Sequence, residues 1–142
     1  MGISLRTFRD VIDDLEIRHS VDKSNGSINF TMTMDNEESV RFVFFINEEQ
    51  EVIQAIALLC DRDIIDSNDF HEAYKFCNHW NDSYKYPKSY VHENTKSIMC
   101  EWTWDTEVDY SDELIKRIIL VGFIKTSQSC FEEAIKNNIY TN

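Results

Sequence analysis

Glycine and proline are scarce in this sequence, which has three glycines and one proline among its 142 residues. So few glycines leave no loop of the kind that cradles phosphate groups, and the G-x-S-x-G motif of serine hydrolases does not occur. The same scarcity, together with an aromatic content of 13%, argues against disorder, fibres and long linkers. The composition therefore predicts a folded globular protein.

Long apolar runs are also missing. The longest uninterrupted run extends from Ile118 to Ile124 and is far too short to span a bilayer. The N-terminal residues lack the apolar core of a secretory signal and carry acidic residues early. We therefore expect a cytoplasmic protein that does not bind membranes.

Closely spaced metal ligands are absent from the sequence. The cysteines, none of which belongs to a C-x-x-C motif, are Cys60, Cys77, Cys100 and Cys130. We expect them to be reduced and buried. His71 and His79 flank Cys77, but the three side chains have different helical phases and do not converge. No serine or cysteine belongs to a pattern that would expose it beside a base. The sequence therefore predicts no metal site, no cofactor and no enzymatic activity.

The charge is strongly one-sided, with 26 acidic and 14 basic residues and a formal net charge of −12. Such a chain repels phosphate backbones, so nucleic acid is not an expected partner. The acidic residues form a solvated surface, contact a basic partner, or act in an acidic inhibitor of the immunity type.

Helical periodicity predicts three helices, capped by Ser4, Ser67 and Ser111. The apolar positions of the first helix are Leu5, Phe8, Val11, Ile12 and Leu15. The second helix is expected to end near Asn81, with a buried stripe of Phe70, Ala73, Tyr74, Cys77 and Trp80. The buried face expected for the last helix is Leu114, Ile115, Ile118, Val121 and Gly122, and Phe131, Ala134 and Ile135 can extend it. Residues 140–142 are expected to fray.

Several segments alternate with period two, as strands do. A weak strand at residues 17–21 precedes Asn25-Gly26, a hairpin signal that requires positive φ at both positions. Residues 28–34 and 98–104 each have one apolar face, and residues 88–92 form a strand after the only proline. Residues 40–46 are apolar on both faces, with Val43 and Phe45 on the second, so this strand is expected to be covered on both sides.

Residues 51–60 are ambiguous, because their composition suits a helix while residues 52–59 also read as a continuous apolar strand. Hairpin-linked strands indicate an antiparallel sheet with helices packed on it. The expected fold class is α+β, in the order α-β-β-β(-β)-α-β-β-α. No repeat or linker divides the chain, so residues 1–142 are expected to form a single domain.

The sequence Cys77-Asn78-His79-Trp80-Asn81 is followed by Pro87-Lys88 and, further on, by Met99-Cys100-Glu101-Trp102. This pattern resembles the YbjN family, small bacterial proteins described as sensory transduction regulators, most closely over about residues 67–136. The family positions carried here are Asn78, Trp80, Asn81, Pro87 and Lys88. We interpret them as a structural corner, in which Trp80 fills the core and Asn78 and Asn81 bond the backbone at the helix end and turn.

The resemblance implies a fold like that of type III secretion chaperones, which favours a strand at residues 52–59. It also implies a non-catalytic cytoplasmic regulator, a homodimer that binds a protein partner. A dedicated chaperone for one secreted effector is the alternative. Trp102 and Trp104, on one strand face, are candidates for an interface because tryptophan is enriched at binding hot spots.

Overall fold

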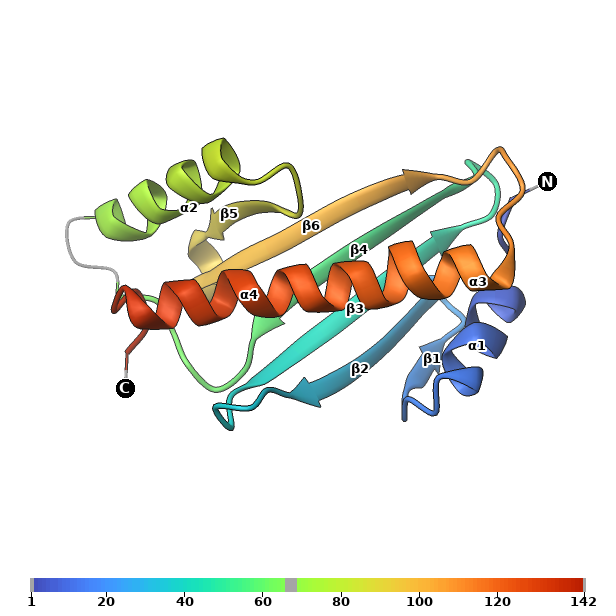
Figure 1. Cartoon of the computed structure of the whole chain (residues 1–142), viewed down its shortest axis with the longest axis horizontal. Helices are drawn as coiled ribbons and strands as arrows, with labels where there is room; N and C mark the ends of the chain where they lie inside the picture. The colour runs from blue at the N-terminus through green and yellow to red at the C-terminus, as the bar shows by residue number, and fades with distance from the viewer. Residues whose placement is uncertain (1, 66–68, 142) are drawn as a thin grey trace.

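The computed structural model describes residues 2–65 and 69–141. The elements are α1 (Leu5–Asp14), β1 (Ser20–Asp22), β2 (Ser27–Thr33), β3 (Ser39–Asn47), β4 (Val52–Leu59), α2 (His71–Ser83), β5 (Lys88–His92), the 3-10 turn η1 (Glu93–Thr95), β6 (Ser97–Asp105), α3 (Asp112–Leu114), the π-helical segment η2 (Ile115–Gly122) and α4 (Phe123–Lys136). The last three form one long helix (Figure 1). The predicted α+β order is confirmed, and residues 52–59 are a strand.

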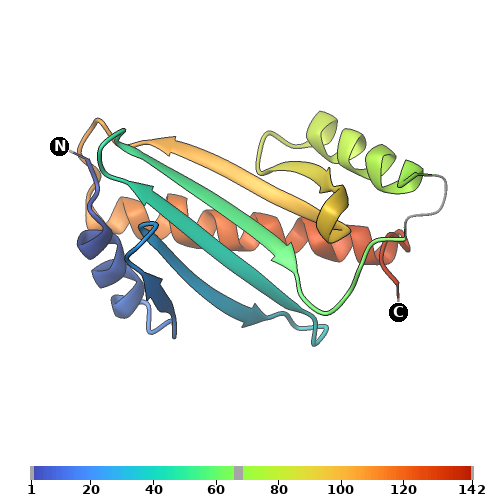
Figure 2. The same ribbon diagram turned by 180° about the vertical axis from the view of Figure 1, so that it is seen from behind.

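The six strands form one antiparallel sheet in the order β1-β2-β3-β4-β6-β5. Its register aligns apolar side chains in rows: Phe44 lies between Ile28 and Ala55, and Ala55 lies opposite Trp102. The long C-terminal helix crosses one face of the sheet (Figure 1), and Figure 2 shows the other face with no helix over it among the described residues. The helices are therefore all on one side of the sheet or beyond its edges.

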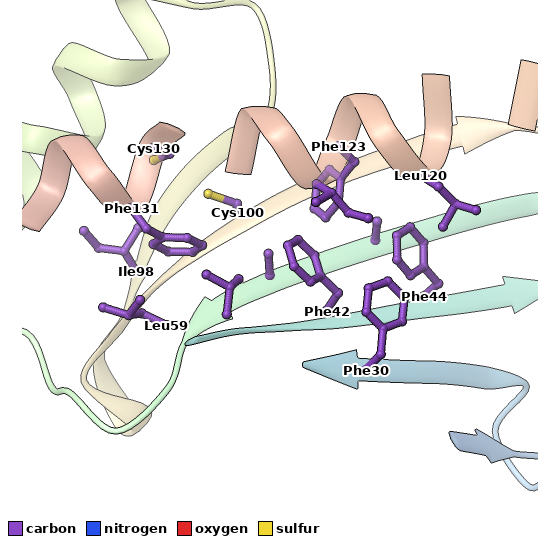
Figure 3. Close-up of a cluster of buried hydrophobic side chains, with 14 of the residues drawn as sticks. Phe30, Phe42, Phe44, Leu59, Ile98, Cys100, Leu120, Phe123, Cys130 and Phe131 are labelled. Carbon is purple, nitrogen blue, oxygen red and sulfur yellow. The ribbon is translucent and has the colours of Figure 1, made fainter. Parts of the chain in front are cut away.

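A cluster of phenylalanines joins the helix-covered face of the sheet to the helices (Figure 3). The ring centroid of Phe44 lies 5.2 Å from that of Phe8 in α1 and 5.9 Å from those of Phe30 in β2 and Phe123 in α4. Phe8 and Phe44 are fully buried, and Phe123 nearly so. These rings connect four elements, so this cluster fixes the helices on the sheet.

The second helix begins at His71 and ends at Ser83. Phe70 precedes it with a positive φ of 64°, and the predicted cap, Ser67, lies outside the described residues. Tyr74 was expected in the buried stripe but is 44% exposed, whereas Phe76 is buried beside Cys77 and Trp80. Because α2 packs mainly against the edge strand β5, only a narrow side of the helix is covered.

The buried face predicted for the last helix was wrong at Leu114 and Ile118, which are 37% and 48% exposed. Ile119 and Phe123 are buried instead, about one residue further along the chain. The segment η2 explains the shift. A π-helix bonds residue i to i+5 and takes more residues per turn, so a face extrapolated at α-helical spacing falls out of phase.

Two smaller predictions were also wrong. Only Gly26 in the β1–β2 loop has positive φ, because four residues rather than two connect the strands. Tyr140 does not fray: it is 5% exposed and pairs with Ile64 in an isolated antiparallel bridge. Within the described residues, every helix is too short or too polar to span a bilayer.

Candidate protein-binding surfaces

The sheet face without helices carries a central apolar patch, which we call the open face: Val43, Phe45, Ile56, Leu58 and Met99. These side chains come from β3, β4 and β6, and each is half-buried. They line a shallow hollow of about 370 Å³ whose rim includes the polar side chains of Asn29 and Arg41. The prediction that both faces of β3 are covered was therefore wrong for Val43 and Phe45. A contiguous apolar patch with a polar rim is typical of a protein-binding surface.

The corner after α2 depends on Asn81. Its Nδ2 donates to the Ser89 carbonyl oxygen and its Oδ1 accepts from the Ser89 backbone N–H, both at 2.9 Å. Ser89 is 1% exposed and lies in β5, an edge strand of the sheet. The side chain therefore replaces a neighbouring strand for this residue. We expected Asn81 to bond the backbone at the helix end and turn, but its bonds are to β5.

The other family positions surround this contact. Trp80 is 4% exposed and its Nε1 donates to the Pro87 carbonyl oxygen at 3.0 Å. Pro87 follows a cis peptide bond and is buried. Lys88 is exposed and its Nζ lies 3.4 Å from the Glu101 carboxylate. Asn78 is exposed on α2. Asn81 thus joins α2 to β5, together with the Cys77 carbonyl, which accepts from the Ser89 hydroxyl at 3.5 Å, and Trp80 joins α2 to the residue just before β5.

Trp102 and Trp104 lie on the helix-covered face of β6, half-buried at the end nearest η2. The Trp102 ring centroid is 5.4 Å from that of Tyr86 and 6.3 Å from that of Trp104. Together with residues of the long helix, these three rings line an apolar hollow of about 420 Å³. The two tryptophans predicted as an interface are thus in contact with each other and partly accessible.

The described residues contain no group of three or more histidine, cysteine and acidic side chains that could hold a metal ion. All four cysteines are free thiols, and Cys77, Cys100 and Cys130 are buried. Cys100 and Cys130 lie side by side between β6 and α4 (Figure 3). Burial raises the pKa of the Cys77 thiol to about 11 and that of Cys100 well above its usual value. Such thiols are poor nucleophiles at neutral pH.

We expect a thiol reagent such as Ellman's reagent to modify only Cys60 rapidly in the native protein. Cys60 is partly exposed, and its pKa is raised above the usual value of a thiol, mainly by burial and then by the nearby Asp61. Its labelling rate should therefore rise about tenfold per pH unit between roughly pH 7 and 9, as the thiolate fraction grows. Cys60→Ser should abolish the fast phase. A fast phase that persists in this variant would reveal a reactive, low-pKa thiol.

Comparison with protein families finds a match over residues 4–134 to the model of the YbjN family, whose description is "Putative bacterial sensory transduction regulator". The chain belongs to the YbjN family. No curated protein matches this YbjN-family chain.

A solved structure shares the fold of this YbjN-family chain. It is a chain of the HopA1–SchA chaperone–effector complex, with a TM-score of 0.54 and 15% sequence identity. The similarity covers 87% of this chain and 88% of that one. The secretion chaperone-like fold implied by the sequence is thereby confirmed.

The open face is what sequence reasoning missed in this YbjN-family protein. Its signal was present, because residues 43 and 45 of β3 and residues 56 and 58 of β4 are apolar on the side opposite the core. The alternation identified both faces of β3 correctly. Whether a second layer covers the outer face depends on where the helices pack. The apolar pattern of a single strand does not predict that placement.

Proposed function

We propose that this protein is a non-catalytic, chaperone-like regulator that binds a protein partner in the cytoplasm and acts as a homodimer. We also propose that residues 1–142 form one domain. The family and the shared fold support a protein-binding role. The observation that carries the proposal is the open face.

A half-buried apolar patch in the middle of an uncovered sheet is unfavourable in water and gains free energy when a second surface covers it. The patch spans three adjacent strands of the sheet, and one of its members, Phe45, provides a large aromatic side chain. Aromatic residues near the centre of such a patch contribute disproportionately to binding. A second copy of the chain is the proposed cover.

Phe45→Glu should convert the dimer into a monomer, because the new carboxylate would be desolvated without a partner at the interface. Light scattering at several protein concentrations measures the effect, and the association constant should fall at least about 100-fold. The matched control is Asn78→Glu, which adds the same charge at an exposed position of α2 and should leave the dimer intact. A wild-type protein that is monomeric at all concentrations contradicts the homodimer.

The protein partner is tested separately by affinity capture from the source cells followed by mass spectrometry. Wild type and Asn78→Glu should retain the same specific protein. Phe45→Glu separates two cases: loss of this protein would mean that the partner needs the dimer or the open face, and retention would place the partner elsewhere. If wild-type protein retains no specific protein, the binding role itself is wrong.

A dedicated chaperone for one secreted effector is the second candidate function, favoured by the structural similarity to a chain of a chaperone–effector complex. Such a chaperone should protect the product of a neighbouring gene when the two are expressed together. The half-life of that product, with and without this protein, measures the effect. Many captured partners and no protected neighbour would instead favour the broader regulator.

A further inference from the structure

The apolar hollow beside Trp102 and Trp104 has the dimensions of a ligand site, and we call it the tryptophan slot. Its walls are Tyr86, Trp102, Trp104, Arg117, Ile118 and Phe123. The volume is about 420 Å³, within the range of roughly 300–1,000 Å³ that small-molecule sites occupy. The slot lies on the helix side of the sheet, so the second copy proposed for the open face does not fill it.

The inner wall of the slot, formed by Trp104 and Phe123, is fixed before anything binds. The Trp104 ring centroid lies 5.9 Å from that of Phe123, which is 2% exposed and packs edge-on against Phe42 and Phe44. A continuous row of rings therefore runs from the exposed Tyr86 through the two tryptophans into the core. Side chains that are already packed, as Trp104 and Phe123 are, lose little entropy when a ligand enters, which favours affinity.

The positive charge of Arg117 indicates which kind of ligand the slot would bind. Of the lining residues that the structure describes, Arg117 alone is charged, although the chain has 26 acidic and 14 basic residues. Its guanidinium makes no ion pair within residues 2–65 and 69–141. An arginine in a lining that otherwise consists of aromatic and aliphatic residues matches a carboxylate attached to a ring system.

The π-helical segment η2 shapes the remaining wall. Its wider winding leaves Ile118 48% exposed at the mouth of the slot, although Ile115 and Ile119 are fully buried. Gly122 keeps the segment compact, because a Cβ there would lie 3.1 Å from the Arg117 carbonyl oxygen. π-helical segments within α-helices are frequent at functional sites. Here the segment places Arg117 and Ile118 in the lining of the same hollow.

We infer that the tryptophan slot binds a small aromatic carboxylate. The ring system enters between Trp102, Trp104 and Ile118, and the carboxylate pairs with Arg117. The lining residues come from two alternate positions of β6, one loop residue and two turns of helix. A hollow enclosed in this way accommodates one ring system rather than the successive side chains of a protein segment. This binding goes beyond the proposed protein-binding role and does not depend on it.

The test uses 1-naphthylacetate as the probe and 1-naphthaleneethanol as its uncharged counterpart. The three tryptophan indole N–H signals are followed by NMR and assigned with Trp102→Phe and Trp104→Phe. A ligand of this size should bind with a dissociation constant of about 1 mM or tighter. The acid should shift the Trp102 and Trp104 signals. The Trp80 signal should stay in place, since its indole donates to Pro87 outside the slot.

Arg117→Gln should weaken binding of the acid about fivefold and leave binding of the alcohol unchanged. Lys125→Gln removes the same charge from an exposed position of α4 outside the slot and should change neither. Ile118→Glu, which places a carboxylate at the mouth, should abolish binding of the acid. All three positions are exposed, so the variants should fold, and their unchanged NMR spectra elsewhere check this.

Four results would overturn the inference. The first is a lack of shifts at several millimolar acid, and the second is a shift of Trp80 alone. The third is equal binding of acid and alcohol with no effect of Arg117→Gln. Signals of Trp102 and Trp104 that move with protein concentration alone would assign the slot to a second copy, and would also contradict it.

Discussion

Replacing Phe44 with alanine should lower the free energy of unfolding by about 3–5 kcal/mol, the range for a large aromatic side chain removed from a core. Phe44 is fully buried and its ring contacts Phe8, Phe30 and Phe123. The cavity would open between the sheet, α1 and the long helix, and the fixed strand register prevents the walls from closing it. Chemical denaturation followed by tryptophan fluorescence measures the change.

The neighbouring residue supplies the control. Phe45 lies on the same strand, but its side chain points to the open face and is half-buried. At protein concentrations low enough to give monomers, Phe45→Ala should cost less than half as much as Phe44→Ala. Dimer formation adds to the stability of the wild type at higher concentrations, and Phe45→Ala should lose this contribution while Phe44→Ala keeps it. The difference in unfolding free energy between the two variants should therefore shrink as the concentration rises. Equal losses at all concentrations would show that both faces are packed alike.

Asn81→Leu should lower the free energy of unfolding by about 2–4 kcal/mol. The substitution removes the two hydrogen bonds to the Ser89 backbone, and a third that the Ser89 hydroxyl donates at 3.3 Å, and leaves the backbone N–H and carbonyl of Ser89 without their partner. Ser89 is 1% exposed, so water does not replace the amide, and each unsatisfied group costs about 1–3 kcal/mol. Denaturation measures the loss, and hydrogen exchange should show β5 opening first.

Asn78→Leu is the matched control, since it makes the same change one helical turn earlier, on an exposed residue of α2. It should alter the stability by less than about 0.5 kcal/mol. The affinity of each folded variant for the captured partner separates a structural corner from a binding site. If Asn81→Leu weakened partner binding more than it weakened folding, the corner would be part of the partner's site.

Hydrophobic periodicity was sufficient to predict an element correctly wherever only one face of that element meets the core. The strands at 28–34 and 98–104 were predicted from alternation because the register places every second side chain under the helices. The first helix was predicted for the same reason, and Ser4 caps it by accepting a hydrogen bond from the Thr7 N–H at 3.0 Å. Residues 52–59 needed the family resemblance, because a short apolar run has no period that separates strand from helix.

The wrong predictions arose where burial of a residue depends on another part of the chain or on the local winding of the helix. Tyr140 was expected to fray near the chain end, but the segment around Ile64 pairs with it across 76 residues of sequence. Ile118 was expected in the core, but the π-helical winding turns it outward. Neither the pairing with the segment around Ile64 nor the π-helical winding can be recognised from the local pattern of apolar residues on which the predictions were based.

The sequence by itself determined the α+β order, the core faces of β2 and β6, and the family, because alternation, capping residues and the Asn-His-Trp-Asn pattern are local. Only the tertiary structure decided that the helices cover a single face, that Asn81 bonds to β5, and that Arg117 meets Trp102 and Trp104 in one hollow. These arrangements join residues that are distant in the chain. Their free energy depends on packing between layers, which local periodicity does not encode.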